Sequence, residues 1–313
     1  MIATRTLVLL ILIVYAASVG VAAPARSVYR GSESRLPATV HDVLSPATSK
    51  AECAKPKPEW IWCDDFETDR LDRYFEYSKA QGRFARTDGG GMDGSFGMRA
   101  QFLKGEIGAG FLHVAFGKTP QPYFRPVDAG TSAHRDIYWR VFVRYDSGWV
   151  GGGGFKMSRA TSFVSESSWA QAMIAHVWSG KTKTHHLAID PASGTDLAGV
   201  VRTTTYNDFP RFRWLGSRGS ITPVFHPSRL GRWHCIEARA RLNDPGATNG
   251  LVELWIDDRP EANSRNLNFV GAMTQYGINA VFLENYWNGG APRQQARYFD
   301  RFIVSTQRIG CRW

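Results

Sequence analysis

The chain has 313 residues, of which 43% are hydrophobic and 13% aromatic, and its formal net charge is +10. The aromatic content excludes wholesale disorder, the 4 cysteines are too few for a disulfide scaffold, and the absence of a Gly-x-y period excludes a collagen. The positive charge favours a polyanionic partner (nucleic acid, anionic lipid or acidic polysaccharide) without choosing among them.

Residues 1–23 have the pattern of a secretory signal peptide. Arg5 precedes an apolar run over residues 7–17, and small residues follow at positions 21–23. An uncleaved anchor is the alternative, because the apolar stretch is almost long enough to span a bilayer. We expect signal cleavage, export and no remaining membrane attachment. Export also favours two disulfides among Cys53, Cys63, Cys235 and Cys311, with all three pairings open.

Residues 24–56 are rich in Ser, Pro, Ala and Lys and predict a flexible linker. Residues 57–313 then form a series of short segments with strand-like alternation, and no amphipathic helix of useful length interrupts them. The expected strands cover residues 98–103, 111–116, 137–145, 155–164, 171–178, 185–189, 200–206, 235–242, 251–257, 280–287 and 297–305. Such a series predicts one all-β domain, an antiparallel β-sandwich of the jelly-roll type.

The outward face of residues 137–145 combines aromatic and basic side chains. Tyr138, Arg140, Phe142 and Arg144 alternate there with apolar residues. Aromatic rings stack on sugar rings, and a guanidinium binds a carboxylate or sulfate with two hydrogen bonds. The alternative is a structural face on which arginine stems cover the rings.

Four glycines at residues 151–154 precede Lys156. They let the backbone turn sharply or approach a ligand, but the spacing of a phosphate-binding loop is absent. Simple alternation places Ser158 on the face of Lys156 and Arg159 on the opposite face. A lysine beside other cations can have a lowered pKa and act as a base. An ordinary surface lysine is the alternative.

Two histidines lie on polar strand faces farther along. His176 shares a face with Trp178, and His186 lies opposite the apolar residues of its segment. Histidine titrates near neutrality and is a common general acid or base, although a structural role is the alternative. A later basic and aromatic stretch suits an anionic sugar or is a solvated loop. It contains Arg202, Tyr206, Arg211, Arg213 and Trp214.

Acidic residues near both ends of the domain could meet if the first and last strands are neighbours. Asp64, Asp65, Glu67 and Asp300 would then suit a structural calcium ion, since Ca²⁺ prefers oxygen ligands. Solvated turn carboxylates are the alternative. The sequence lacks the Gly-x-Ser-x-Gly, His-Glu-x-x-His and Glu-x-Asp-x-x-Glu patterns, so it predicts no serine hydrolase, no zinc site and no common sandwich glycosidase.

The segment WVGGGGFK at 149–156 resembles the glycine-rich stretch and lysine of jelly-roll polysaccharide lyases acting on alginate or glucuronan (polysaccharide lyase family 14 and relatives). Residues 233–257 and 287–305 resemble their late hairpin and closing strands, which many concanavalin A-like sandwiches share. The resemblance covers most of the chain after residue 60 and implies a catalytic role for Lys156. The family's arginine and alternating tyrosines are replaced here by His176, His185 and His186.

We therefore predict a secreted lyase that cleaves an acidic, uronate-containing polysaccharide by β-elimination without a cofactor. The predicted catalytic residues are Lys156, His176, His186 and Tyr286. The predicted substrate-binding residues are Tyr138, Arg140, Arg144, Arg159, Trp178, Arg202 and Tyr206; Tyr206 is also a candidate acid. A non-catalytic lectin-like module and a sandwich glycoside hydrolase are the alternatives, while export disfavours nucleic-acid binding.

Overall fold

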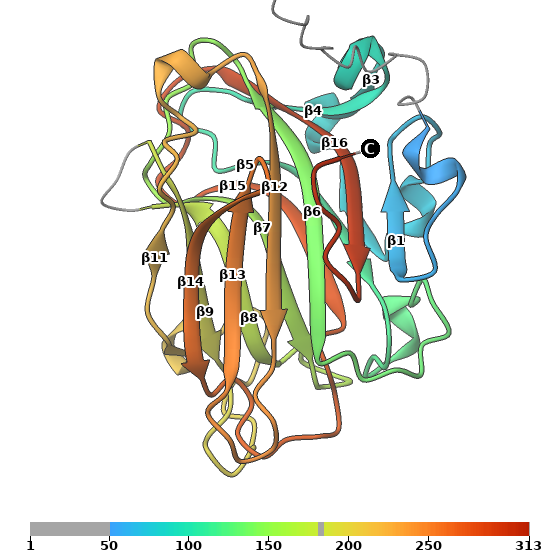
Figure 1. The fold of residues 1–313 in the computed structure, drawn as a ribbon, viewed down its shortest axis with the longest axis vertical. Coiled ribbons are helices and arrows are strands. Elements are labelled where there is room, and N and C mark those ends of the chain that lie inside the picture. Colours follow the sequence, from blue (N-terminus) through green and yellow to red (C-terminus); the bar gives the residue numbers. More distant parts are fainter. Residues whose placement is uncertain (1–50, 181–184, 313) are drawn as a thin grey trace, which may run out of the picture. The chain divides into compact units, whose positions relative to one another are not determined.

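The computed structural model describes residues 51–180 and 185–312, which form two antiparallel β-sheets packed face to face (Figure 1). The predicted signal peptide and linker residues 24–50 lie outside the described residues. Within the described ranges the only helical elements are short 3-10 turns, and no helix is long and apolar enough to cross a membrane. The prediction of an all-β antiparallel sandwich is confirmed.

Each sheet has eight strands. The first sheet contains, in spatial order, β14 (Arg259–Leu267), β13 (Gly250–Ile256), β12 (Trp233–Arg241), β6 (Asp136–Tyr145), β16 (Gln295–Ser305), β4 (Gly97–Phe102) and β3 (Phe84–Thr87), with β1 (Trp60–Asp64) also pairing with β16. The second sheet contains β10 (Arg213–Trp214), β9 (Leu187–Ser193), β8 (Gln171–Ser179), β7 (Phe155–Phe163), β15 (Ala280–Trp287), β5 (Gly108–Ala115) and β2 (Glu76–Ser78), with β11 (Arg218–Gly219) also pairing with β9.

Ten of the eleven expected strands have a counterpart, but the one at residues 200–206 is wrong. Except for an isolated bridge between Thr195 and Val201, that segment is a loop. Its amides bond to acceptors outside a strand pair: the Arg202 amide donates to the Gly194 carbonyl at 2.8 Å, and the Thr204 amide donates to Asp208 Oδ2 at 2.8 Å. Strand β14 was not predicted, because this edge strand is polar and shows no clear alternation.

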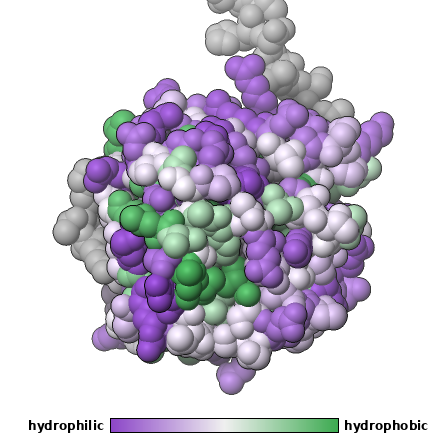
Figure 2. All heavy atoms as spheres, turned by 90° about the horizontal axis from the view of Figure 1, so that it is seen from below, coloured by the Kyte–Doolittle hydropathy of each residue, from purple (hydrophilic) through white to green (hydrophobic). Residues whose placement is uncertain are grey.

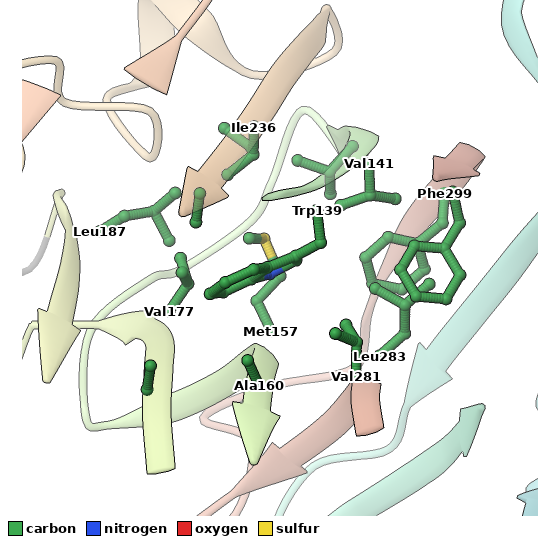
Figure 3. Packing of buried hydrophobic residues seen from close by; sticks show 14 of the residues in the cluster. Trp139, Val141, Met157, Ala160, Val177, Leu187, Ile236, Val281, Leu283 and Phe299 are labelled. Carbon is green, nitrogen blue, oxygen red and sulfur yellow. The ribbon is translucent and has the colours of Figure 1, made fainter. Parts of the chain in front are cut away.

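The core lies between the sheets, where the inward residues of β6 meet those of the second sheet. Trp139 is buried there, and Figure 3 shows it among Val141, Met157, Ile236 and other apolar side chains. Its indole Nε1 donates a hydrogen bond of 3.0 Å to Ser158 Oγ, so the one polar atom of the ring is satisfied. Alternate residues of β6, from Ile137 to Tyr145, belong to this core, which agrees with the predicted period of two.

A β-bulge in β7 changes the expected orientation of two residues. The pairing register with β8 shifts between Lys156 and Ser158. Because a bulge adds one residue to one strand, Ser158 turns into the core and Arg159 joins Lys156 on the outer face. The expectation that Ser158 shares the face of Lys156 is therefore wrong.

Two disulfides crosslink the sandwich, as predicted. Cys53 pairs with Cys63 at the start of the domain, and Cys235 pairs with Cys311 near the C-terminus. The first of these disulfides ties Cys53, in the predicted linker, to the first strand of the domain. Glu52, in the same segment, forms an ion pair with buried Arg140.

Three of the four acidic residues considered for calcium have protein partners, while Glu67 Oε1 has no hydrogen-bond partner among the described residues. Asp64 accepts hydrogen bonds from the Tyr74 hydroxyl and from Arg70, which also binds Asp65, while Asp300 accepts the Met92 amide at 2.8 Å. Among the described residues, no group of three or more His, Cys, Asp or Glu side chains is placed to hold a metal ion.

Candidate functional site

A cleft of about 930 Å³ lies over the outer face of the second sheet. Side chains from β2, β5, β7 and β15 line it, together with the turn after β2 and the segment that leads into β10. Seen from below, much of the surface is hydrophilic, and a group of hydrophobic residues gathers on one part of it (Figure 2). A concave site with several convergent polar groups is the arrangement expected of a binding site for a small molecule or a polymer segment.

Lys156 lies at this cleft and is only 4% exposed. Its Nζ is 4.6 Å from the ring centre of Tyr286 and 5.2 Å from that of Phe209, so aromatic rings flank the amine. Burial lowers the pKa of Lys156; the charge of Glu284 opposes this effect, and that of Arg159 adds to it. Lys156 therefore has more of the neutral, proton-accepting form than an exposed lysine.

Arg159 is fully buried behind the cleft. Its guanidinium contacts three residues that line the cleft. Nη1 donates to Asn207 Oδ1 at 2.6 Å, and Nη2 donates to the Tyr206 hydroxyl and lies 3.1 Å from Glu284 Oε1. Burial is the main cause that raises the pKa of Tyr206 to about 12. The Tyr206 hydroxyl thus keeps its proton at neutral pH and is available as a donor.

His113 forms a second polar group at the cleft, which sequence reasoning missed. Its Nδ1 lies 3.0 Å from Glu76 Oε2, and its ring is stacked between Phe111 and Phe282. Burial lowers the pKa of His113, so the neutral ring donates from Nδ1 to Glu76 and leaves Nε2 as an acceptor. Neither His113 Nε2 nor Glu284 Oε2 has a hydrogen-bond partner among the described residues.

The sequence contained a signal for His113 and for Glu284, which sequence reasoning also missed. His113 lies between apolar Leu112 and Val114, and Glu284 follows Leu283 in an alternating strand. A polar residue on the face of such a strand that points away from the core is a candidate for a binding or catalytic site. Which strands lie beside Lys156, however, depends on the topology.

His176 and Trp178 are on the same sheet face as Lys156 but are not exposed to the cleft. The His176 ring is fully buried and stacked on Trp178 at 5.0 Å, with Trp214 as a further parallel neighbour. Burial lowers the pKa of His176 well below its usual value, and Arg159 and Lys156 add to this effect. His176 therefore does not lie where it could reach a substrate in the cleft.

The other predicted residues lie elsewhere. Tyr138, Arg140 and Arg144 belong to β6 in the first sheet, so they do not share a surface with Lys156. Arg140 is buried, and the Arg144 guanidinium lies 4.2 Å from the Tyr298 ring centre, which agrees with the structural alternative. His186, whose Nδ1 is 2.9 Å from the Ser220 carbonyl, precedes β9, and Arg202 pairs with Asp196 in a loop. Of the eleven predicted residues, Lys156, Tyr206 and Tyr286 line the cleft, and Arg159 supports it from behind.

No known protein-family profile matches the chain, and no curated protein sequence is similar to it. Solved structures are similar in fold. An alginate lyase of family PL-14 from Aplysia kurodai has a TM-score of 0.54 at 13% identity, covering 79% of this chain and 99% of that one. A glucuronan lyase from the fungus Trichoderma reesei has 0.54 at 12%, covering 79% and 96%. An alginate lyase from a Chlorella virus has 0.52 at 13%, covering 74% and 91%. The chain thus has the jelly-roll fold of these polysaccharide lyases.

Proposed function

We propose that the protein is a secreted lyase that cleaves a uronate-containing polysaccharide by β-elimination in the cleft of the second sheet. The observation that carries this proposal is the buried Lys156 amine, which has a lowered pKa and lies between the rings of Tyr286 and Phe209. The fold shared with alginate and glucuronan lyases supports it. The two disulfides are compatible with an oxidising, extracellular compartment.

The reaction needs a base and an acid. The base removes the proton from the carbon beside the uronate carboxylate, the released electron pair forms a carbon–carbon double bond, and the bond to the glycosidic oxygen breaks. In our proposal the neutral Lys156 amine accepts that proton, and the Tyr286 hydroxyl protonates the leaving oxygen. The two residues are direct partners in the register of β7 and β15, so both act from one side of the sugar chain.

The substrate carboxylate must also be neutralised, because negative charge develops beside it in the transition state. Arg159 donates to the oxygen atoms of Asn207 and Tyr206. The Asn207 side chain also hydrogen-bonds with Tyr206, so the Tyr206 oxygen accepts and its hydroxyl proton can be donated to a carboxylate, with the charge of Arg159 behind it. We therefore assign the recognition of the uronate carboxylate to Tyr206.

The test is incubation with alginate, glucuronan and glycosaminoglycans while the ultraviolet absorbance of the unsaturated uronate product is followed. Lys156→Ala is expected to lower the turnover number by about 10²–10⁴-fold, the usual contribution of a positioned base, and to leave binding measurable. Lys118→Ala is the matched control. Lys118 also lies near an aromatic ring, 5.3 Å from the centre of Tyr276, but it is exposed and does not line the cleft.

Two other outcomes would overturn the proposal. Binding of a polyuronate by the wild-type protein without any absorbance would indicate a lectin-like module. New reducing ends without the unsaturated product would indicate a glycoside hydrolase, for which the cleft carboxylates of Glu76 and Glu284 would be the first residues to substitute.

A further inference from the structure

An aromatic surface continues from the cleft toward the edge of the second sheet. Trp214 in β10 is 40% exposed, which is unusual for a large aromatic side chain on a sheet face. Its ring is nearly parallel to Trp178, with 8° between the planes and 6.3 Å between centroids, and it lies 6.1 Å from Phe209. Phe209 in turn flanks Lys156. A series of neighbouring side chains thus leads out of the cleft, from Tyr286 through Lys156 and Phe209 to Trp214.

The position of Trp214 is fixed by its surroundings. In β10, Trp214 pairs with Ala192 of β9, and the Leu215 amide donates to the Pro191 carbonyl at 2.9 Å. Phe212, two residues earlier, is buried against Ile174 and Ala192 and anchors the segment. A rigid ring loses little conformational entropy when a ligand covers it, so this geometry favours binding.

These side chains follow one another across the strands of the second sheet, and this arrangement limits the size of the ligand that could contact them all. From β15 to β10 the backbones of the second sheet take four steps between neighbouring strands, roughly 19 Å at about 4.8 Å per step, but the side chains approach one another above the sheet: Lys156 Nζ is 5.2 Å from the Phe209 ring centre, which is 6.1 Å from that of Trp214. Trp214 itself does not line the cleft around Lys156. A ligand that contacts both Lys156 and Trp214 must therefore extend beyond the cleft, as a chain of sugar units does and a single sugar does not.

We propose that Trp214, together with Phe209, forms an outer subsite that binds a further sugar ring of the polysaccharide chain by stacking. The apolar face of a pyranose ring covers a flat aromatic side chain well, and the interaction requires no charge on that sugar. This inference rests on the proposed function, because it assigns to the substrate of the Lys156 site a length of several sugar units. It predicts that Trp214 contributes to the affinity for long substrates and not for short ones.

The experiment measures binding of defined oligouronates, a trimer and a hexamer, by calorimetry in the Lys156→Ala background, where turnover is suppressed. Trp214→Ala is expected to weaken hexamer binding at least about tenfold and to leave trimer binding unchanged. Trp214→Phe keeps a ring and should retain most of the hexamer affinity. Trp255→Ala, on the first sheet, is the matched control and should change neither affinity.

The outcomes separate this inference from the proposed function. Equal loss of trimer and hexamer affinity, or no loss of either, overturns the outer subsite even if the wild-type protein is a lyase. A selective loss of hexamer affinity in Trp214→Ala, in a protein that forms no unsaturated product, supports the subsite and overturns the lyase. A Trp214→Phe variant that loses as much affinity as Trp214→Ala, with an unchanged melting temperature, also contradicts stacking.

Discussion

Glu284 balances the positive charges of the cleft, and Glu284→Gln tests that role. Its Oε1 lies 3.1 Å from Arg159 Nη2, with 9% of the Glu284 side chain and 0% of the Arg159 side chain exposed. Removing one partner of a buried ion pair typically costs about 3–5 kcal/mol, because the other charge stays buried. Arg159 keeps its bonds to Asn207 and Tyr206, so we expect the lower end, about 3 kcal/mol. This corresponds to a fall in melting temperature of roughly 6–12 °C for a domain of this size.

The same substitution should change the pH dependence of the reaction. The charge of Glu284 raises the pKa of Lys156, against the effects of burial and of Arg159. Without that charge the pKa of Lys156 falls further, so the neutral amine forms at lower pH. Because activity rises with pH as the amine loses its proton, the ascending limb of kcat/KM is expected to move toward lower pH in Glu284→Gln.

Both effects are measurable on one preparation, by thermal unfolding and by the rate of unsaturated-uronate formation across pH. Asp244→Asn is the control: it removes a carboxylate that is 59% exposed and pairs with Arg241, and exposed pairs contribute about 0–1 kcal/mol. This control should leave the pH profile in place. An unchanged melting temperature and an unchanged pH profile in Glu284→Gln would refute the role of Glu284.

The disulfides and one buried carboxyl give further predictions. In the chain-entropy account, loss of the Cys235–Cys311 disulfide, whose loop spans 76 residues, should lower the free energy of unfolding by roughly 4 kcal/mol. Loss of Cys53–Cys63, whose loop spans 10 residues, should lower it by roughly 3 kcal/mol. Denaturant unfolding of the serine variants measures both losses, and the reverse order would contradict this prediction. Burial raises the pKa of Asp300 from 3.8 to about 7, so unfolding releases a proton between these values and the free energy of unfolding falls as pH rises through them, by up to about 4 kcal/mol. Asp300→Asn should flatten the unfolding free energy over that pH range; an unaltered slope would contradict the assignment.

The alternation of apolar residues predicted most of the fold, because a sandwich buries one face of each long strand. The predicted strand at 280–287 coincides with β15, and the predicted inward residues of 137–145 all belong to the core between the sheets. Short strands such as β2 and β10 escaped prediction, since two or three residues cannot show a period. The edge strand β14 escaped because it buries few side chains.

The candidate site was harder to predict, because alternation says whether a residue faces inward or outward but not which of the two sheets carries it. Arg140 and Arg159 both belong to strands that mix basic and aromatic residues. Arg140 nevertheless lies in the first sheet and pairs with Glu52, whereas Arg159 lies behind the cleft. Only the pairing order of strands far apart in sequence separates them.

A single inserted residue also decides which groups can act together. With regular alternation in β7, Arg159 would point into the core, and Ser158 would lie beside Lys156. The bulge between Lys156 and Ser158 instead places both cations on the outer face, where Arg159 organises Tyr206 and Glu284 and its charge lowers the pKa of Lys156. A sequence pattern with a period of two cannot reveal a bulge, because the extra residue leaves the residue types unchanged. Burial is the main cause of the lowered pKa of Lys156, and the backbone register adds the charge of Arg159 to that effect.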